Sequence, residues 1–201
     1  MSQRFGLDQN VKDYIDAAAA APGVPVLSAA PVDYVAAIVA TSLLTDGNAT
    51  APSDGDQLTV AGKQYTFKTT LTPLEGEVLI NTTADAALLN LARAINHTGT
   101  ANTDYKCAAA NANVSASASV SSHHITLTAL VAGVAGNSLA VTQDTGTSFT
   151  VAAFASGADA IPGTVGLAGQ MGTFGGVAYV CLADATVTST GKWKRVSTAS
   201  L

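Results

Sequence analysis

The sequence predicts an α+β protein in which an antiparallel, β-rich sheet packs against one helix. Three observations predict this class. Apolar and polar residues alternate on both sides of Ala61-Gly62, as in a β-hairpin. A stripe of apolar residues at helical spacing follows, between Leu88 and Ile95. Alternation then resumes over residues 114–130, and the helix stripe must face the apolar rows of the sheet.

Composition divides the chain into three expected parts: an N-terminal arm at 1–31, an α+β core at 32–156 and a C-terminal segment at 157–201. Asp8 can cap a short helix in the arm, and a proline-rich connector follows it. Such a helix is marginal alone, so we expect it to dock on a partner or to fold back on its own core. The candidate partner-binding residues of the arm are Phe5, Val11, Tyr14 and Ile15.

In the core, residues 35–44 are rich in β-branched side chains and predict a strand, which a turn at 46–48 ends. The hairpin follows, with Leu58 and Val60 on one strand and Tyr65 and Phe67 on the other. Tyr65 and Phe67 are two residues apart and therefore point to the same face.

The central helix is the best-defined element. Thr82 or Thr83 can cap it, and Asp85 suits the positive end of the helix dipole. The segment His97-Thr98-Gly99 ends it, and Gly99 is able to adopt the left-handed conformation.

A second hairpin is predicted from residues 114–120 and 125–130. The glycine-containing segment 132–137 predicts a turn. Residues 138–143 and 148–154 predict two more strands, joined by the turn at 144–146.

The C-terminal segment begins with a stretch rich in glycine, expected to be a linker or loop, and ends in a predicted β-hairpin of residues 177–182 and 192–197. Two strands alone are not stable in water. Tyr179, Cys181 and Trp193 must therefore pack on the core or on another subunit, and we take Tyr179 and Trp193 as candidate oligomer or partner contacts.

Charge is scarce, because only 11% of residues are charged and none lies between Cys107 and Gln143. A surface without charge is poorly protected against association. It predicts burial against neighbouring subunits; the alternative is a robust monomer with a threonine-rich sheet face. The net charge of −5 argues against a nucleic-acid partner, and we interpret Lys192, Lys194 and Arg195 as a solvated strand face.

The sequence shows no sign of a membrane partner or of secretion. No apolar run reaches the roughly 20 residues of a membrane span, and residues 1–10 lack a basic start followed by a hydrophobic run. We therefore expect synthesis and retention in a cytosol, at least until release. Cys107 and Cys181 are expected to be buried free thiols.

No metal or cofactor is expected. His123 and His124 are adjacent, so as strand residues they would point to opposite faces and could not easily chelate one ion. Asp46, Asp54 and Asp56, with Asn48, could offer oxygen ligands to calcium, but their spacing fits no EF-hand loop. Turn formation is the alternative role of these aspartates.

Catalysis is not expected either. The sequence has no GxSxG nucleophile elbow and no phosphate-binding glycine loop. Glu75 and Glu77 flank one glycine in the same predicted loop, so they would not oppose each other across a cleft as glycosidase carboxylates do.

The segments GDQLTVAGKQYTFKTTL, TADAALLNLARAIN and VSASASVSSHHITLTALVAGVAGNSLAV, over roughly residues 50–145, resemble a small α+β module of tailed-bacteriophage virion structural proteins. The ending AYVCLADATVTSTGKWKRVSTASL is also similar to the close of many phage virion proteins. The resemblance implies a non-enzymatic, homo-oligomeric structural component.

Within a virion we expect a decoration or cement protein of the head, a homotrimer bound to the major capsid protein or other virion proteins and assembled in the bacterial host cytoplasm. The alternatives are a tail, baseplate or fibre-associated protein, or a host-surface binding module.

Overall fold

The computed structural model describes residues 30–46, 50–143, 149–164, 170–174, 177–182, 185–186 and 188–195. Chain contacts divide it into two compact units. Ala37–Asp159 forms the first unit, and the segments before and after it, up to Ala36 and from Ala160, belong together in the second. The arm helix expected near residue 8, with Phe5, Val11, Tyr14 and Ile15, lies outside the described residues.

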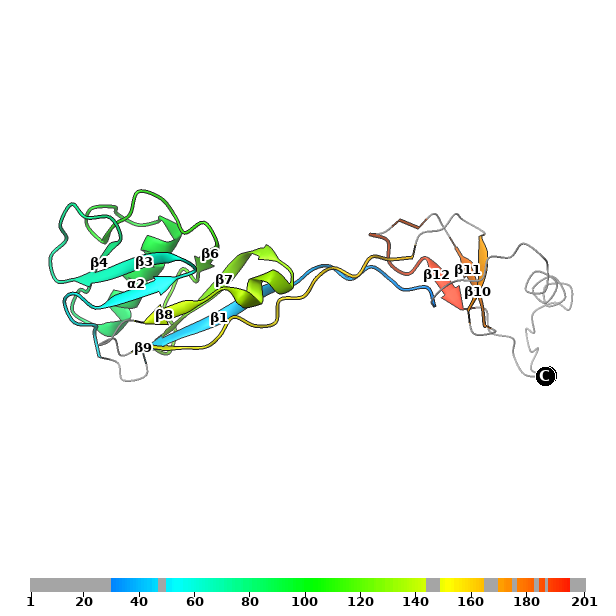
Figure 1. Ribbon diagram of the computed structural model, residues 1–201, viewed down its shortest axis with the longest axis horizontal. Helices are drawn as coiled ribbons and strands as arrows, with labels where there is room; N and C mark the ends of the chain where they lie inside the picture. Colours follow the sequence, from blue (N-terminus) through cyan, green and yellow to red (C-terminus); the bar gives the residue numbers. More distant parts are fainter. Residues whose placement is uncertain are drawn as a thin grey trace, which may run out of the picture. The chain divides into compact units, whose positions relative to one another are not determined.

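The first unit contains a four-stranded, fully antiparallel sheet in the order β6-β7-β1-β9 (Figure 1). Its strands are β1 (Val39–Asp46), β6 (Val114–Ala116), β7 (His124–Ala132) and β9 (Phe149–Val151). The predicted hairpin of residues 114–130 is confirmed by the pairing of β6 with β7. The strand expected from residue 35 begins at Val39, because Val35 and Ile38 form only isolated bridges.

A second sheet in this unit has five strands in the order β5-β4-β3-β2-β8. They are β2 (Gln57–Val60), β3 (Lys63–Lys68), β4 (Glu77–Leu79), β5 (Tyr105–Lys106) and β8 (Val141–Gln143). The predicted hairpin is confirmed: Val60 pairs with Lys63 across a turn in which Ala61 and Gly62 have φ values of 46° and 87°. Positive φ at both central residues is the geometry of a type I′ turn.

The single antiparallel sheet expected from the sequence is therefore wrong in two respects. The core has two sheets, and β3 and β4 pair in parallel. The two strands predicted around residues 144–146 do not pair with each other: β8 joins β2, whereas β9 joins β1. Alternation alone predicts a strand but does not specify its partner.

Helix α2 (Ala84–Asn96) begins as predicted, with the Thr83 side chain accepting a hydrogen bond from the Ala86 N–H. It ends at His97, which takes the left-handed conformation at φ 53°, while Gly99 also has positive φ. The segment 132–137, predicted as a turn, contains most of the short 3₁₀ helix η1 (Val134–Ser138).

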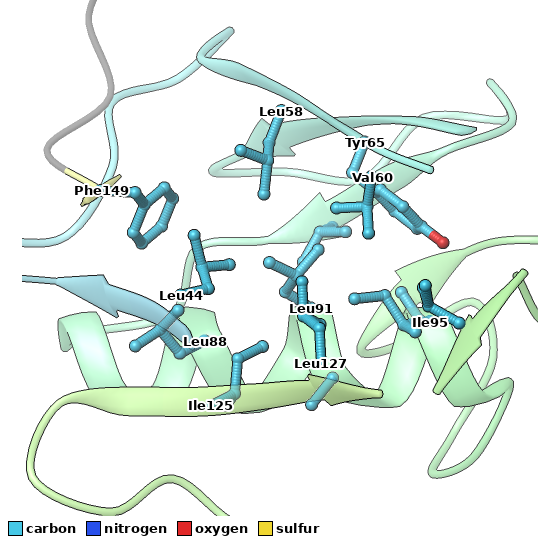
Figure 2. Close-up of a cluster of buried hydrophobic side chains, with 14 of the residues drawn as sticks. Leu44, Leu58, Val60, Tyr65, Leu88, Leu91, Ile95, Ile125, Leu127 and Phe149 are labelled. Carbon is cyan, nitrogen blue, oxygen red and sulfur yellow. The ribbon is translucent and has the colours of Figure 1, made fainter. Parts of the chain in front are cut away.

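The helix contacts both sheets of the first unit. It touches β4 and β5 of the five-stranded sheet and β6 and β7 of the four-stranded sheet. Figure 2 shows the side chains buried between these elements. Leu44, Ile125 and Leu127 come from one sheet, Leu58, Val60 and Tyr65 from the other, and Leu88, Leu91 and Ile95 from the helix. The α+β class is thus confirmed, with the core enclosed by two sheets and one helix.

The second unit contains a three-stranded antiparallel sheet, β10-β11-β12. Its strands are β10 (Met171–Phe174), β11 (Val177–Cys181) and β12 (Trp193–Arg195). The predicted C-terminal pairing is confirmed by β11 and β12. The glycine-rich stretch was expected to be a linker or loop without a strand, and β10 shows that this prediction was wrong. Strands pair through main-chain N–H and C=O groups, which glycine has like any other residue, so a glycine-rich segment can still pair with β11.

Candidate interaction surface

The outer face of the four-stranded sheet carries hydroxyl and apolar side chains with one imidazole, and it has no Asp, Glu, Lys or Arg at any described strand position. Strand alternation places Leu44, Ile125 and Leu127 inward, and their neighbours in sequence therefore point outward. We call the outward set the hydroxyl face; its members are Thr41, Leu43, Thr45, Ser115, His124, Thr126, Thr128 and Thr150.

The register aligns these side chains in rows across the strands. Thr128 pairs with Ser115 on one side and with Thr41 on the other. Leu43 pairs with Thr126, and Thr45 pairs with Thr150. All are half-buried or exposed, so the rows are open to solvent in the described part of the chain.

Exposed aliphatic side chains adjoin the hydroxyl face where β7 ends. Leu130 is 54% exposed and Val131 is 70% exposed, and Val134 follows in η1 at 54%. Ile38, 52% exposed, is tied to this end because its carbonyl accepts from the Gly133 N–H. Leu43 adds an apolar side chain within the face itself. By alternation Leu130 extends the hydroxyl face, whereas Val131 points to the opposite side of β7 and the Val134 N–H donates to the exposed Asp159 carboxylate at 2.9 Å. Exposed apolar side chains beside uncharged polar ones are typical of an interaction site.

The five-stranded sheet also presents amide and hydroxyl groups outward. Gln57, Thr59, Gln64 and Thr142, with Gln143, surround a shallow hollow of about 230 Å³. The Gln64 amide donates to Gln57 Oε1 at 3.1 Å. The Gln57 amide in turn donates to the Thr66 hydroxyl at 3.5 Å, so the polar groups of this surface too are uncharged.

A groove of about 650 Å³ runs beside the solvent face of α2. Leu89, Ala86 and Val120 give it apolar walls. At the start of the helix Asp85 Oδ1 lies 2.8 Å from His123 Nδ1, and towards its end Arg93 pairs with Asp104 at 3.3 Å. Both charged groups of the groove thus already have partners.

The two histidines do not form a metal site. His123 lies in the turn before β7 with φ 63° and contacts Asp85, whereas His124 begins β7 opposite Thr45. Across the described ranges, no three His, Cys, Asp or Glu side chains gather closely enough to hold a metal ion.

The aspartates weighed as calcium ligands take separate structural positions. Asp54 accepts from Lys68 Nζ and from the Thr69 N–H, both at 2.7 Å, and the Lys68 hydrogen bond is the main reason its pKa falls to about 2. Asp56 accepts from the Ser53 N–H, and Asp46 is buried in β1. Asn48 lies outside the described residues.

Glu75 and Glu77 also fix local structure. Glu75 pairs with Lys63 at 3.4 Å and accepts from the Ala108 N–H at 2.9 Å. Glu77 is buried and accepts from the Thr72 hydroxyl at 2.8 Å. Glu75 lines an open hollow of about 300 Å³, whereas Glu77 is held by Thr72.

The two cysteines are buried and form no disulfide, as predicted. Burial raises the pKa of the Cys107 thiol, which keeps it protonated and unreactive at neutral pH.

The predicted contact residues of the C-terminal hairpin lie in the second unit. Tyr179 and Trp193 are half-buried, and the Trp193 indole N–H donates to the Thr164 carbonyl at 2.8 Å. Cys181 is fully buried. The contribution of Tyr179 and Trp193 to a partner contact stays a prediction.

The sequence indicated an uncharged surface but not where it would gather. The rows of the hydroxyl face depend on the register of β1 with β6-β7 and β9, which are distant in sequence. The groove beside α2 and the Asp85–His123 pair were also missed, since no local pattern brings residues 85 and 123 together.

Among the described residues, no helix is long and apolar enough to cross a membrane. No family model, curated protein or solved structure matches this chain.

Proposed function

We propose that this chain is a structural component of a tailed-bacteriophage virion, a decoration or cement protein of the head, and that it transforms no substrate. The observation that carries the proposal is the hydroxyl face: rows of Thr, Ser and Leu side chains with His124 at one end, open to solvent and without Asp, Glu, Lys or Arg, across the described strands of one sheet. The sequence resemblance to phage virion proteins supports the same class.

The physical argument concerns what the hydroxyl face does when it is covered. Burying ionised groups is expensive unless they are paired, and this face has no Asp, Glu, Lys or Arg to bury. Its hydroxyl groups can exchange water for hydrogen bonds with a partner, while Leu43 and Leu130 contribute apolar area. Since the chain carries a net charge of −5, an uncharged face is also where copies of it approach with least repulsion.

The proposed mechanism is thermodynamic. A protein that binds the assembled shell but not its free subunits stabilises the shell by mass action. Stable protein interfaces bury on the order of 1,600 Å² in total. We propose a homotrimer that reaches this area through contacts between its own copies and with the major capsid protein, and that resides in the virion.

Copy number and head stability test the proposal together. Quantitative mass spectrometry of purified particles should find this chain in a copy number that matches the capsid lattice, and particles stripped of it should release DNA at lower temperature. A copy number in small multiples of three or six, with heads that stay equally stable, would indicate a tail or baseplate protein. Adhesion of the isolated protein to host cells would indicate a receptor-binding module.

A further inference from the structure

The structure points to a second interaction site, and we propose that strand β12 is a docking edge for an extended acidic segment of another protein. β12 and the residue before it carry Lys192, Lys194 and Arg195. Lys194 and Arg195 are exposed, and none of the three has an ion-pair partner among the described residues. This proposal does not depend on the proposed virion function.

Unpaired cations set β12 apart from the rest of the described chain. In the first unit every lysine and arginine has a polar partner. These contacts are Lys63–Glu75, Lys68–Asp54, Arg93–Asp104 and Lys106–Asn102. Between residues 37 and 159 the sequence has nine acidic and four basic residues, yet the cluster in β12 is left without an acidic partner in the described part of the chain.

Among the described strands, β12 has a partner on one side alone. It lies at the edge of the described sheet, whose order is β10-β11-β12. The Leu182 N–H donates to the Lys192 carbonyl at 2.8 Å, so Lys192 and Lys194 direct their main-chain groups toward β11. By alternation, the main-chain groups of Trp193 and Arg195 point away from β11, where an added strand would lie.

The side chains specify what such a strand should carry. Lys192 and Lys194 share one face with Leu182, which is 60% exposed, whereas Trp193 and Arg195 lie on the other. Two consecutive acidic residues on the added strand would therefore meet Lys194 on one face and Arg195 on the other.

Protection of the edge and nucleic-acid binding are weaker accounts of the cluster. Lysine on an edge strand protects against aggregation. That role would be met by Lys192 and Lys194 alone, so it does not explain Arg195 on the opposite face of β12. A nucleic acid would need many phosphate contacts for useful affinity, and the cluster offers three cations. A peptide strand uses both the charges and the free main-chain edge.

Trp193 provides the readout, because it is the only tryptophan of the chain and lies in β12. The full-length protein is titrated with a short blocked peptide, Thr-Val-Asp-Glu-Val-Thr, while its fluorescence is followed. We expect saturable binding that weakens with salt. Affinity should fall roughly tenfold or more for the Lys194→Glu/Arg195→Glu variant and for the Asn-Gln version of the peptide.

Controls separate edge pairing from simple charge attraction. Lys106→Glu removes a lysine from the first unit and should bind the peptide as the unaltered protein does, and Lys194→Arg should retain binding. A peptide with proline in place of both valines keeps the charge but loses main-chain donors, and its affinity should drop. Circular dichroism confirms that each variant is folded.

The proposal is overturned by any of three results: no saturable change in Trp193 fluorescence, equal affinity for the proline peptide, or tighter binding of a single-stranded oligothymidylate. If the Lys194→Glu/Arg195→Glu variant misfolds, Lys194→Gln/Arg195→Gln replaces it, and unchanged affinity of that variant contradicts the proposal equally.

Discussion

The side-chain amide of Asn96 forms two hydrogen bonds with the main chain of Ala116, donating to its carbonyl and accepting from its N–H, both at 2.8 Å. The amide thus takes the place of a neighbouring peptide group along the outer edge of β6. This contact ties the last residue of α2 to the four-stranded sheet and occupies a sheet edge that would otherwise be open to pairing.

Replacing Asn96 with Ala should destabilise the protein by about 1–2 kcal/mol, because two main-chain groups of Ala116 lose their partner. Asn96→Asp should also destabilise, since the carboxylate cannot donate to the Ala116 carbonyl. Thr98→Ala, at an exposed position just beyond the helix, is the matched control. Urea unfolding measures the difference, and equal midpoints for Asn96→Ala and Thr98→Ala would contradict the assignment.

Gly76 and Gly62 form a second matched pair, because both have φ 87° but only Gly76 is crowded. A Cβ at Gly76 would lie 2.7 Å from the Gln64 carbonyl oxygen, whereas one at Gly62 would meet nothing within 4 Å. Gly62→Ala should cost about 1 kcal/mol of backbone strain, and Gly76→Ala about 3 kcal/mol or more. Chemical unfolding measures the loss of unfolding free energy in each variant. Equal losses would show that the chain moves to relieve the contact at Gly76, which would contradict this prediction.

The acid range tests the contact between Lys68 and Asp54. That hydrogen bond lowers the pKa of Asp54 from 3.8 to about 2. A lowered folded-state pKa gives stability that is present above pH 3.8 and lost as pH falls toward 2. Asp54→Asn should therefore be less stable than the unaltered protein at neutral pH, and the unfolding free energies of the two proteins should converge near pH 2. A difference in unfolding free energy that stays constant between neutral pH and pH 2 would contradict the stabilising role of the Lys68–Asp54 contact.

The alkaline range tests the burial of Tyr65. Burial raises the pKa of Tyr65 from 10.0 to about 12. A raised folded-state pKa gives stability that is present below pH 10 and lost as pH rises toward 12. Tyr65→Phe should cost less than about 1 kcal/mol at neutral pH, since only the 3.4 Å contact with Asn111 is lost. Absorbance at 295 nm follows the ionisation of tyrosine. In this titration the Tyr65→Phe variant should lack one phenol that ionises at high pH in the unaltered protein.

The elements that sequence reasoning located correctly are those with local signals. The Ala61-Gly62 turn and the Thr83 cap depend on residues a few positions apart. The apolar stripe of α2 is likewise contained in one helix, and Leu88, Leu91 and Ile95 are all fully buried.

Apart from the missed strand β10, which pairs with the nearby β11, the errors in strand pairing concern partners that are distant in sequence. Whether β8 and β9 pair with each other depends on β1 and β2, about 100 residues earlier in the chain. The parallel pair β3-β4 similarly depends on how residues 69–76 return the chain to the sheet. For the same reason the sequence predicted an uncharged surface but could not assign Thr41 and Thr128 to adjacent positions on it.

The most direct test of the central claim adds charge to the hydroxyl face. Thr41 and Thr128 are adjacent across β1 and β7 and point to solvent, so Thr41→Glu/Thr128→Glu should leave the fold intact but prevent burial of that face. Analytical ultracentrifugation of the full chain should show an oligomer for the unaltered protein and a monomer for the variant, with equal circular dichroism. An unaltered protein that sediments as a monomer at all concentrations, or a variant that associates equally well, would contradict the account.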